Sequence, residues 1–170
     1  MSDAPWLAVR RLAPGEAAAY REIRLAGLLE SPEAFGSVYD EAAGLPLETF
    51  ERRLSASSVI AAFADGTIVG MASVTAEEGL QDRHKAFVTG FFVRAAYRGN
   101  GVADALLAAV VRAAGAPVEQ LLLTVVAGND RAVRFFERHG FQRYGLEPRA
   151  LKTPSGYRDE ILFVRSLPSM

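Results

Sequence analysis

The sequence contains no cysteine, and its only histidines are His84 and His139. A chain without cysteine can form no disulfide, offers no thiolate to a metal and has no cysteine nucleophile. Two histidines are also too few for a histidine-rich metal site. We therefore expect no bound metal.

Neither sign of charge is in excess, because 19 Lys and Arg stand against 20 Asp and Glu. Nucleic-acid-binding proteins usually carry a basic excess, so we expect no nucleic-acid partner. No apolar run approaches the ~20 residues of a membrane-spanning helix. The first residues, MSDAPWLAVRR, lack the apolar stretch of a signal peptide. The expected location is the cytoplasm, without a membrane partner.

The chain has 170 residues, of which 50% are hydrophobic and 23% are charged. These values are typical of a soluble globular protein, and the length suits one domain with a substantial core. The sequence shows no repeat, linker or low-complexity segment. We therefore predict a single domain spanning residues 1–170.

Apolar periodicity and turn signals predict strands and helices in a mixed order. Strands are expected over residues 7–11, 58–64, 67–75, 85–93, 120–126, 141–152 and 157–166. Helices are expected over residues 14–29, 47–56, 102–114 and 129–139. The run 85–93 is almost wholly apolar, which is typical of a strand buried on both faces. The predicted fold class is α/β (α+β), with a mixed central sheet of about seven strands flanked by helices.

The turn between strand 85–93 and helix 102–114 is the most informative stretch. The first N–H groups of a helix have no partner within it and bind anions. Glycines let the backbone approach an anion closely, and an arginine adds a fixed positive charge. A plain direction-changing turn is the alternative. The residues of this candidate diphosphate site are Arg98, Gly99, Asn100, Gly101, Val102 and Ala103.

Two segments carry a resemblance to a known family. The spacing Arg98-x-x-Gly101-x-Ala103 resembles the R/Q-x-x-G-x-G/A motif of the GNAT superfamily of acyl-CoA-dependent N-acyltransferases. The segment 129–141 resembles the N-x-x-A-x-x-x-Y-x-x-x-G-F motif of the same family. Both stand in the family's order and at its usual separation, and the resemblance covers residues 7–167.

The resemblance implies that acetyl-CoA is the co-substrate. Its pantetheine arm would follow the backbone of Phe91, Phe92 and Val93, and its diphosphate would lie on the amides of residues 98–103. Strands 85–93 and 120–126 would splay apart at their C-terminal ends to admit the cofactor and the amine. Asn129 either caps the following helix or contacts the cofactor's arm.

Acyl transfer to an amine needs an oxyanion donor and a base. The backbone N–H of Val93 is the candidate donor, and Glu41 and Glu78 are the candidate bases. Phe136 stands where the family usually has tyrosine, so the usual acid is absent. We interpret Phe136 as a wall for the cofactor's arm. The proton donor stays open between water and a tyrosine, either Tyr39, Tyr144 or Tyr157.

The resemblance thus predicts a transferase that moves an acetyl group from acetyl-CoA to a primary amine by direct attack in a ternary complex. A small-molecule acceptor is the first hypothesis, and acidic residues near the cleft would favour a cationic amine. The alternatives are a protein acetyltransferase acting on an N-terminus or a lysine, and a non-catalytic acyl-CoA-binding module. Homodimerisation is also left open.

Overall fold

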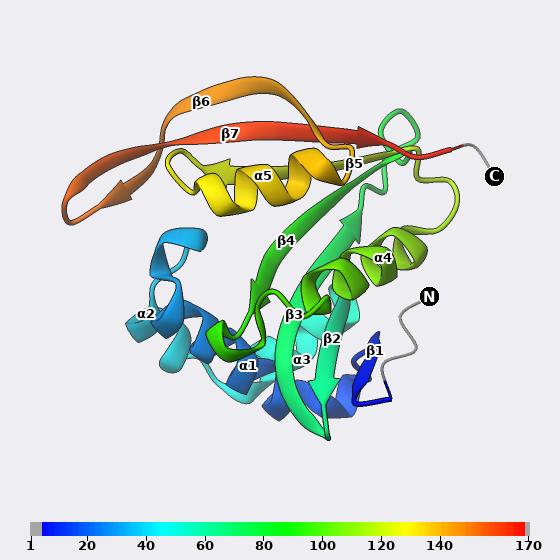
Figure 1. Ribbon diagram of the computed structural model, residues 1–170, viewed down its shortest axis with the longest axis vertical. Helices are drawn as coiled ribbons and strands as arrows, with labels where there is room; N and C mark the ends of the chain where they lie inside the picture. Colours follow the sequence, from blue (N-terminus) through cyan, green and yellow to red (C-terminus); the bar gives the residue numbers. More distant parts are fainter. Residues whose placement is uncertain (1–4, 169–170) are drawn as a thin grey trace. The chain divides into compact units, whose positions relative to one another are not determined.

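The computed structural model describes residues 5–168. Its seven strands form a mixed sheet in the order β1-β2-β3-β4-β5-β7-β6 (Figure 1). The strands are β1 (Leu7–Arg11), β2 (Ser58–Ala64), β3 (Thr67–Ala76), β4 (Lys85–Val93), β5 (Gln120–Val126), β6 (Gln142–Thr153) and β7 (Gly156–Ser166). The helices are α1 (Ala17–Glu30), α2 (Tyr39–Ala43), α3 (Leu47–Ala56), α4 (Val102–Ala114) and α5 (Asp130–Arg138). Short 3₁₀ turns lie at η1 (Pro14–Glu16), η2 (Pro32–Ala34) and η3 (Ala95–Tyr97).

The chain divides into two compact units. The first comprises residues 1–75 and 88–115, and the second comprises residues 76–87 and 116–170. The predicted single domain, 1–170, therefore stays a prediction, and its outermost residues, 1–4 and 169–170, lie outside the described part of the chain. Within that part, no helix is both long and apolar enough to cross a membrane.

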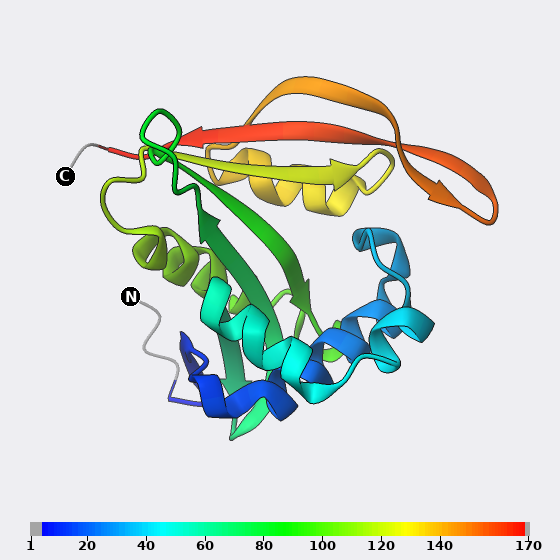
Figure 2. The ribbon, with the colours of Figure 1, turned by 180° about the vertical axis from the view of Figure 1, so that it is seen from behind.

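The first unit is built on an antiparallel arrangement of β1, β2 and β3. β1 pairs with β2 from Leu7↔Ala64 to Arg11↔Ile60, and β2 pairs with β3. The β2–β3 turn has positive φ at both Asp65 (46°) and Gly66 (83°). Tight hairpins of type I′ need this backbone, so the Asp-Gly pair explains the turn. Helix α4 covers one face of these strands, and α1 and α3 cover the other (Figures 1 and 2).

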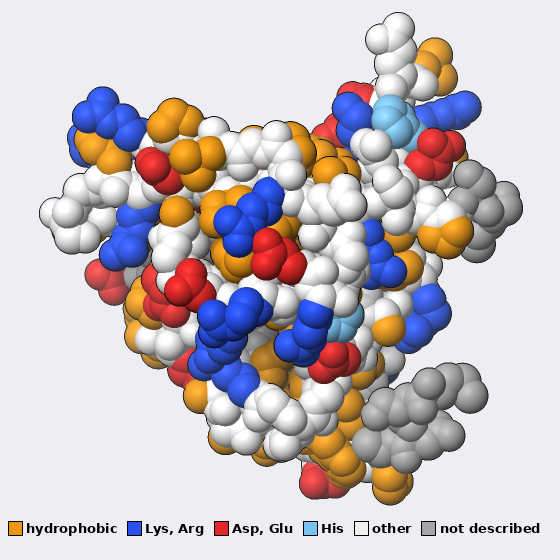
Figure 3. Space-filling view, turned by 45° about the horizontal axis from the view of Figure 1, so that its top comes forward, with side chains coloured by type: hydrophobic (Ala, Val, Ile, Leu, Met, Phe, Trp, Pro, Cys, Tyr) orange, Lys and Arg blue, Asp and Glu red, His pale blue; other side chains and the backbone are white. Residues whose placement is uncertain are grey.

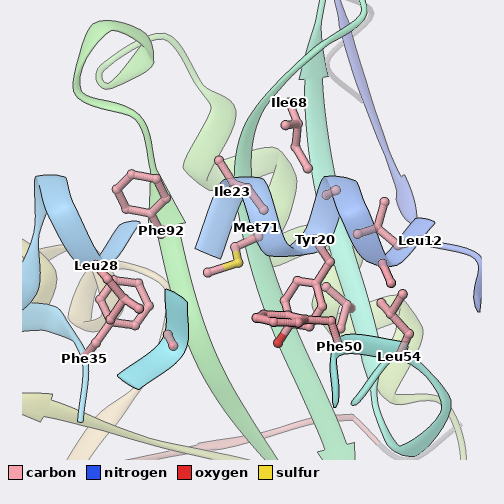
Figure 4. Packing of buried hydrophobic residues seen from close by; sticks show 14 residues of the cluster. Leu12, Tyr20, Ile23, Leu28, Phe35, Phe50, Leu54, Ile68, Met71 and Phe92 are labelled. Atoms are coloured by element: carbon pink, nitrogen blue, oxygen red, sulfur yellow. The ribbon is translucent and has the colours of Figure 1, made fainter. Parts of the chain in front are cut away.

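The core of the first unit lies between α1, α3 and the strands, where buried side chains form one cluster (Figure 4). Phe50 and Ile23 are 0% exposed. The rings of Tyr20 and Phe50 meet edge to face at 5.7 Å. Because such buried aromatics contribute large apolar areas, this cluster fixes α1 and α3 against the sheet.

The second unit is organised around β5. This strand pairs antiparallel with β7 from Gln120↔Ser166 to Val126↔Glu160, and β7 pairs with β6. The first residues of β4 pair in parallel with β5, from Lys85↔Gln120 to Phe87↔Leu122. The two strands that the sequence analysis expected to splay apart are therefore parallel neighbours over these three pairs. The splay farther along the two strands stays a prediction.

Two expectations from the sequence were wrong. The first half of β4 is buried on one face only, because Ala86 and Val88 are buried whereas Phe87 is 40% exposed and Thr89 is exposed. An apolar run alone cannot show whether both faces are covered, since that depends on which elements pack there. The sequence also predicted no helix between residues 29 and 47, where the structure has the short helix α2 (Tyr39–Ala43).

Candidate functional site

The turn that leads from β4 into α4 has an unusual backbone. Gly99 and Gly101 have φ values of 80° and 81°, in the left-handed region that favours glycine. A Cβ added at either glycine would meet nothing within 4 Å. The glycines are therefore needed for the direction of the chain, and the space beside each of them is open.

Helix α4 begins at this turn without a side-chain cap. Gly101 is its N-cap residue and, as a glycine, offers no side-chain cap. The amide of Ala105 makes the first helical bond, to the Gly101 carbonyl at 3.0 Å. The preceding amides point out of the helix end, where the helix dipole is positive. In a helix of 13 residues this arrangement suits an anionic group.

Arg98 is turned towards the protein. Its Nε donates to the Val93 carbonyl at 2.8 Å, and its Nη2 donates to the Ser31 hydroxyl at 2.9 Å. Its guanidinium carbon lies 5.9 Å from the centre of the Phe92 ring. Arg98 therefore ties the turn to the end of β4 and to the segment after α1, and direct contact with a phosphate stays a prediction.

Arg94 and Glu30 also fix the position of the turn. The Arg94 amide donates to the Val69 carbonyl at 2.8 Å, and the Ala95 amide donates to Glu30 Oε2 at 3.0 Å. The Arg94 guanidinium also lies 3.5 Å from Glu30. The sequence analysis missed these residues, because Glu30 and Arg94 are far apart in the chain and belong to neither motif.

The last residues of β4 are mostly core. Phe92 is 4% exposed and Val93 is 6% exposed, whereas Phe91 is half-buried. Gly90 has a φ of 61°, which interrupts the alternation of the strand. With two of the three side chains buried, the backbone is the part of this segment that suits contact with a ligand.

A pocket of about 250 Å³ lies in the same unit. Its lining comes from α1, α3, β3 and β4 and consists of Tyr20, Arg24, Arg53, Ala56, Ser57, Ser73, Thr75 and Thr89. Two arginines and five hydroxyl groups therefore line it, without a carboxylate. The sequence analysis named none of these residues, although Tyr20 and Arg24 lie one helical turn apart in α1 and face the same way.

Arg24 is a partly buried charge of the pocket. Its Nη2 donates to the Ser37 hydroxyl at 2.8 Å, while its Nε is buried and has no hydrogen-bond partner. Burial lowers the pKa of Arg24, the charge of Arg53 lowers it further, and Tyr20 opposes the shift. A buried cation is costly unless a counter-charge is supplied.

Neither candidate base lines this pocket. Glu41, in α2, and Glu78, in the β3–β4 connection, are both exposed. Glu41 belongs to the first unit and Glu78 to the second. Their roles as bases stay predictions, since neither lines the pocket.

Asn129 and Phe136 have local structural roles in the second unit. The Asn129 side chain accepts a hydrogen bond from the Ala132 amide at 3.3 Å, which makes it the N-cap of α5. Phe136 is 6% exposed and packs edge to face on Phe135 (5.1 Å) and on Phe141 (5.4 Å). The N-cap prediction is confirmed for Asn129, and contact of either residue with a cofactor stays a prediction.

In the described part of the chain, charged groups show no arrangement for a metal. Among residues 5–168, no three His, Cys, Asp or Glu side chains come together as metal ligands. Acidic and basic side chains are interspersed over the face that Figure 3 shows.

The chain resembles known proteins in sequence and in fold. The profile of the Acetyltransferase (GNAT) family matches residues 25–141. A comparison with curated proteins found no match.

Many solved structures have a fold similar to that of this chain. An acetyltransferase of the GNAT family from Streptococcus pneumoniae is 25% identical, with a TM-score of 0.85 over 95% of this chain and 99% of its own. A GCN5-related N-acetyltransferase from Kribbella flavida is 29% identical, with a TM-score of 0.73 over 96% and 99%. A putative acetyltransferase from Salmonella typhimurium, solved with its cofactor acetyl-CoA, is 18% identical, with a TM-score of 0.75 over 97% and 96%.

Proposed function

Because the chain belongs to the acetyltransferase (GNAT) family, we propose that it transfers the acetyl group of acetyl-CoA to a primary amine of a small molecule. The observation that carries the proposal is the uncapped start of α4, where Gly99 and Gly101 leave open space beside backbone amides. The Salmonella typhimurium protein of the same fold, which was solved with acetyl-CoA, supports this choice of co-substrate.

The residues of the first unit fit such a co-substrate. The amides of residues 99–103 would hold the diphosphate, because a helix N-terminus stabilises negative charge. The backbone of Phe91, Phe92 and Val93 would hold the pantetheine arm. Acetyl-CoA supplies an activated thioester, and the Val93 N–H would stabilise the negative charge that develops on its carbonyl oxygen.

Direct attack in a ternary complex requires a neutral amine. At pH 7 most primary amines are protonated, so a base must first remove a proton. Glu41 and Glu78 are the proposed bases, and a water chain is the alternative. Phe136 has no hydroxyl and cannot donate a proton to the leaving thiolate. We propose that the thiolate leaves unprotonated or takes its proton from water, because a thiol pKa of ~8.5 makes it a tolerable leaving group.

The proposal is tested by calorimetry with acetyl-CoA on the wild type, Gly101→Ala and Gly66→Ala. Both glycines have φ values above 80° and open space beside them, so both substitutions introduce similar backbone strain. We expect Gly101→Ala to weaken acetyl-CoA binding by about tenfold or more, since the backbone shifts at the diphosphate. Gly66→Ala, in the β2–β3 turn, should bind as the wild type does.

A release assay for free thiol over a panel of amines then tests the transfer itself. Turnover of small amines supports the proposed function, whereas turnover of peptides alone favours a protein acetyltransferase. Binding without turnover favours the non-catalytic module. Absence of acetyl-CoA binding, or equal binding by both glycine variants, would overturn the cofactor assignment.

A further inference from the structure

The pocket of the first unit has the chemistry of an anion site. Its side chains bring two positive charges and the hydroxyls of Tyr20, Ser57, Ser73, Thr75 and Thr89 to a volume of about 250 Å³. Arginine and hydroxyl groups are the usual partners of carboxylate and phosphate oxygens. The volume is that of a few small polar groups, since a water molecule takes up about 30 Å³.

Within residues 5–168, the groups that contact Arg24 include no carboxylate. Its guanidinium is held by the Ser37 hydroxyl (2.8 Å) and lies 5.8 Å from the centre of the Phe35 ring. Burial lowers the pKa of Arg24, Tyr20 raises it through its charge and a hydrogen bond, and Arg53 lowers it, but neither residue is a carboxylic acid. Its buried Nε–H donor has no hydrogen-bond acceptor. Leaving a buried cation without an anion is unfavourable, so the site is prepared for a ligand that carries the anion.

Arg53, which lies in α3, brings the second positive charge to the pocket. Its guanidinium carbon lies 5.5 Å from the Phe50 ring, which is fully buried, so the side chain is held by packing. Arg24 and Arg53 are close enough for the charge of one to lower the pKa of the other. The positive charges of Arg24 and Arg53, both held on helices, repel each other, and an anion bound between them would offset this repulsion.

The pocket also shares an element with the proposed transfer site. Thr89 lines the pocket and lies on β4, two residues before Phe91. Gly90, between them, brings the backbone close to Arg24, because a Cβ built there would lie 3.5 Å from Arg24 Nη1. A ligand in the pocket therefore lies along the same strand as the predicted acetyl-CoA contact.

We propose that this pocket binds an acidic group of the acceptor, so that the substrate is an amine that also carries a carboxylate or a phosphate-like group. This inference rests on the proposed function. It adds an acidic group to the cationic amine expected from the sequence, because two arginines and no carboxylate line the pocket.

The first experiment measures binding without turnover. The thermal midpoint is recorded with glutarate, with inorganic phosphate and with the neutral glutaramide. A ligand that binds only the folded state raises the midpoint. We expect glutarate or phosphate to raise it and glutaramide to have no effect, and the stronger of the two anions identifies the class of acid. Equal effects of glutarate and glutaramide, or none from either anion, would overturn the proposal.

Variants assign the effect to this pocket. Arg24→Gln and Arg53→Gln should each remove most of the anion-dependent shift, and Arg24→Lys should restore part of it. Arg52→Gln is the matched control, because Arg52 is exposed on the same helix as Arg53 and does not line the pocket. Arg53→Gln keeps the test decisive where Arg24→Gln does not fold. An unchanged shift in both glutamine variants contradicts the proposal.

The second experiment uses the reaction. Amino acids with short and long spacers between amine and acid are compared with their carboxamides as acceptors. We expect kcat/KM to favour the acids by about tenfold or more, and Arg53→Gln to abolish this preference while the Kd for acetyl-CoA stays unchanged. Equal use of acids and carboxamides by the wild type argues against the acidic acceptor. Absence of acetyl-CoA binding by the wild type, in contrast, would contradict the proposed function itself.

Discussion

Arg98 and Arg24 show how far the role of one residue depends on its surroundings. Arg98 belongs to a recognisable motif, yet its Nε and Nη2 donate hydrogen bonds to Val93 and Ser31 inside the first unit. Arg24 belongs to no motif, yet it is a partly buried charge of a pocket. Residue type and spacing predicted that the positive charge of Arg98 would bind a ligand at the turn after β4. Packing decided that Arg24 lines the pocket.

Glu16 gives a prediction for pH. Its carboxylate accepts hydrogen bonds from Arg10 (2.7 Å) and from the Ala13 amide (2.7 Å). The hydrogen bond from Arg10 is the main reason that the pKa of Glu16 falls to about 2. Because this pKa lies below that of the unfolded chain, near ~4.5, the pair stabilises the fold above that pH and the effect disappears as pH falls towards 2.

Glu16→Gln should therefore lower the free energy of unfolding at pH 7 by at most ~1 kcal/mol, since the pair is largely exposed. The difference from the wild type should shrink in urea titrations repeated between pH 4.5 and pH 2. Glu51→Gln, an exposed glutamate of α3, is the control. A difference that grows as pH falls would show that the Arg10 pair does not stabilise the fold.

At the scale of elements, α1 contains a glycine that its packing requires. Gly27 is buried within the helix. A Cβ there would lie 2.8 Å from Phe35 Cζ and 3.1 Å from Phe92 Cγ. The two rings, whose centres are 6.3 Å apart, close over the helix at this point. Close approach of the rings therefore outweighs the ~1 kcal/mol that glycine costs in a helix.

Gly27→Ala should destabilise the protein by about 1–3 kcal/mol, because the rings must move and the gain in helix propensity is smaller. Gly15→Ala is the matched control, since Gly15 has open space beside it and its φ is not in the left-handed region. That control should be neutral or stabilise by ~0.5 kcal/mol. Denaturant unfolding measures both, and a Gly27→Ala protein more stable than the wild type would contradict this account.

At the scale of the whole molecule, the chain connects its two units repeatedly. It passes from one to the other at residues 75/76, 87/88 and 115/116. β3 and β4 each contain residues of both units. Because a shared strand cannot unfold in one unit alone without losing its pairing in the other, we propose that residues 1–170 unfold as one domain.

Phe163→Ala tests this proposal. Phe163 lies in β7 of the second unit and is 0% exposed, so its truncation should cost about 3–5 kcal/mol. The only tryptophan, Trp6, lies in the first unit and reports its unfolding by fluorescence. We expect Phe163→Ala to lower the urea midpoint seen by Trp6. An unchanged Trp6 midpoint, with a second transition by circular dichroism, would indicate two independent domains.

Local patterns in the sequence determined most of the fold. β1, β4, β5, α3 and α4 have the predicted bounds, and Asn129 caps α5 as expected. The glycines of residues 98–103 and the spacing of both motifs also led to the family. These features depend on neighbours within a few residues, where spacing, glycine and caps act directly on the backbone.

Only the tertiary structure decided the contacts that give the site its chemistry. Ser31 meets Arg98 across 67 positions of sequence, and Arg94 contacts Glu22 across 72. The pocket joins Tyr20 and Arg24 of α1 to residues of α3, β3 and β4. No local sequence pattern predicts such long-range contacts, because they follow from how α1 and α3 pack on the sheet. The sequence therefore predicted an acetyl-CoA-dependent transferase, whereas the packing supplied the charge of the pocket that we assign to its acceptor.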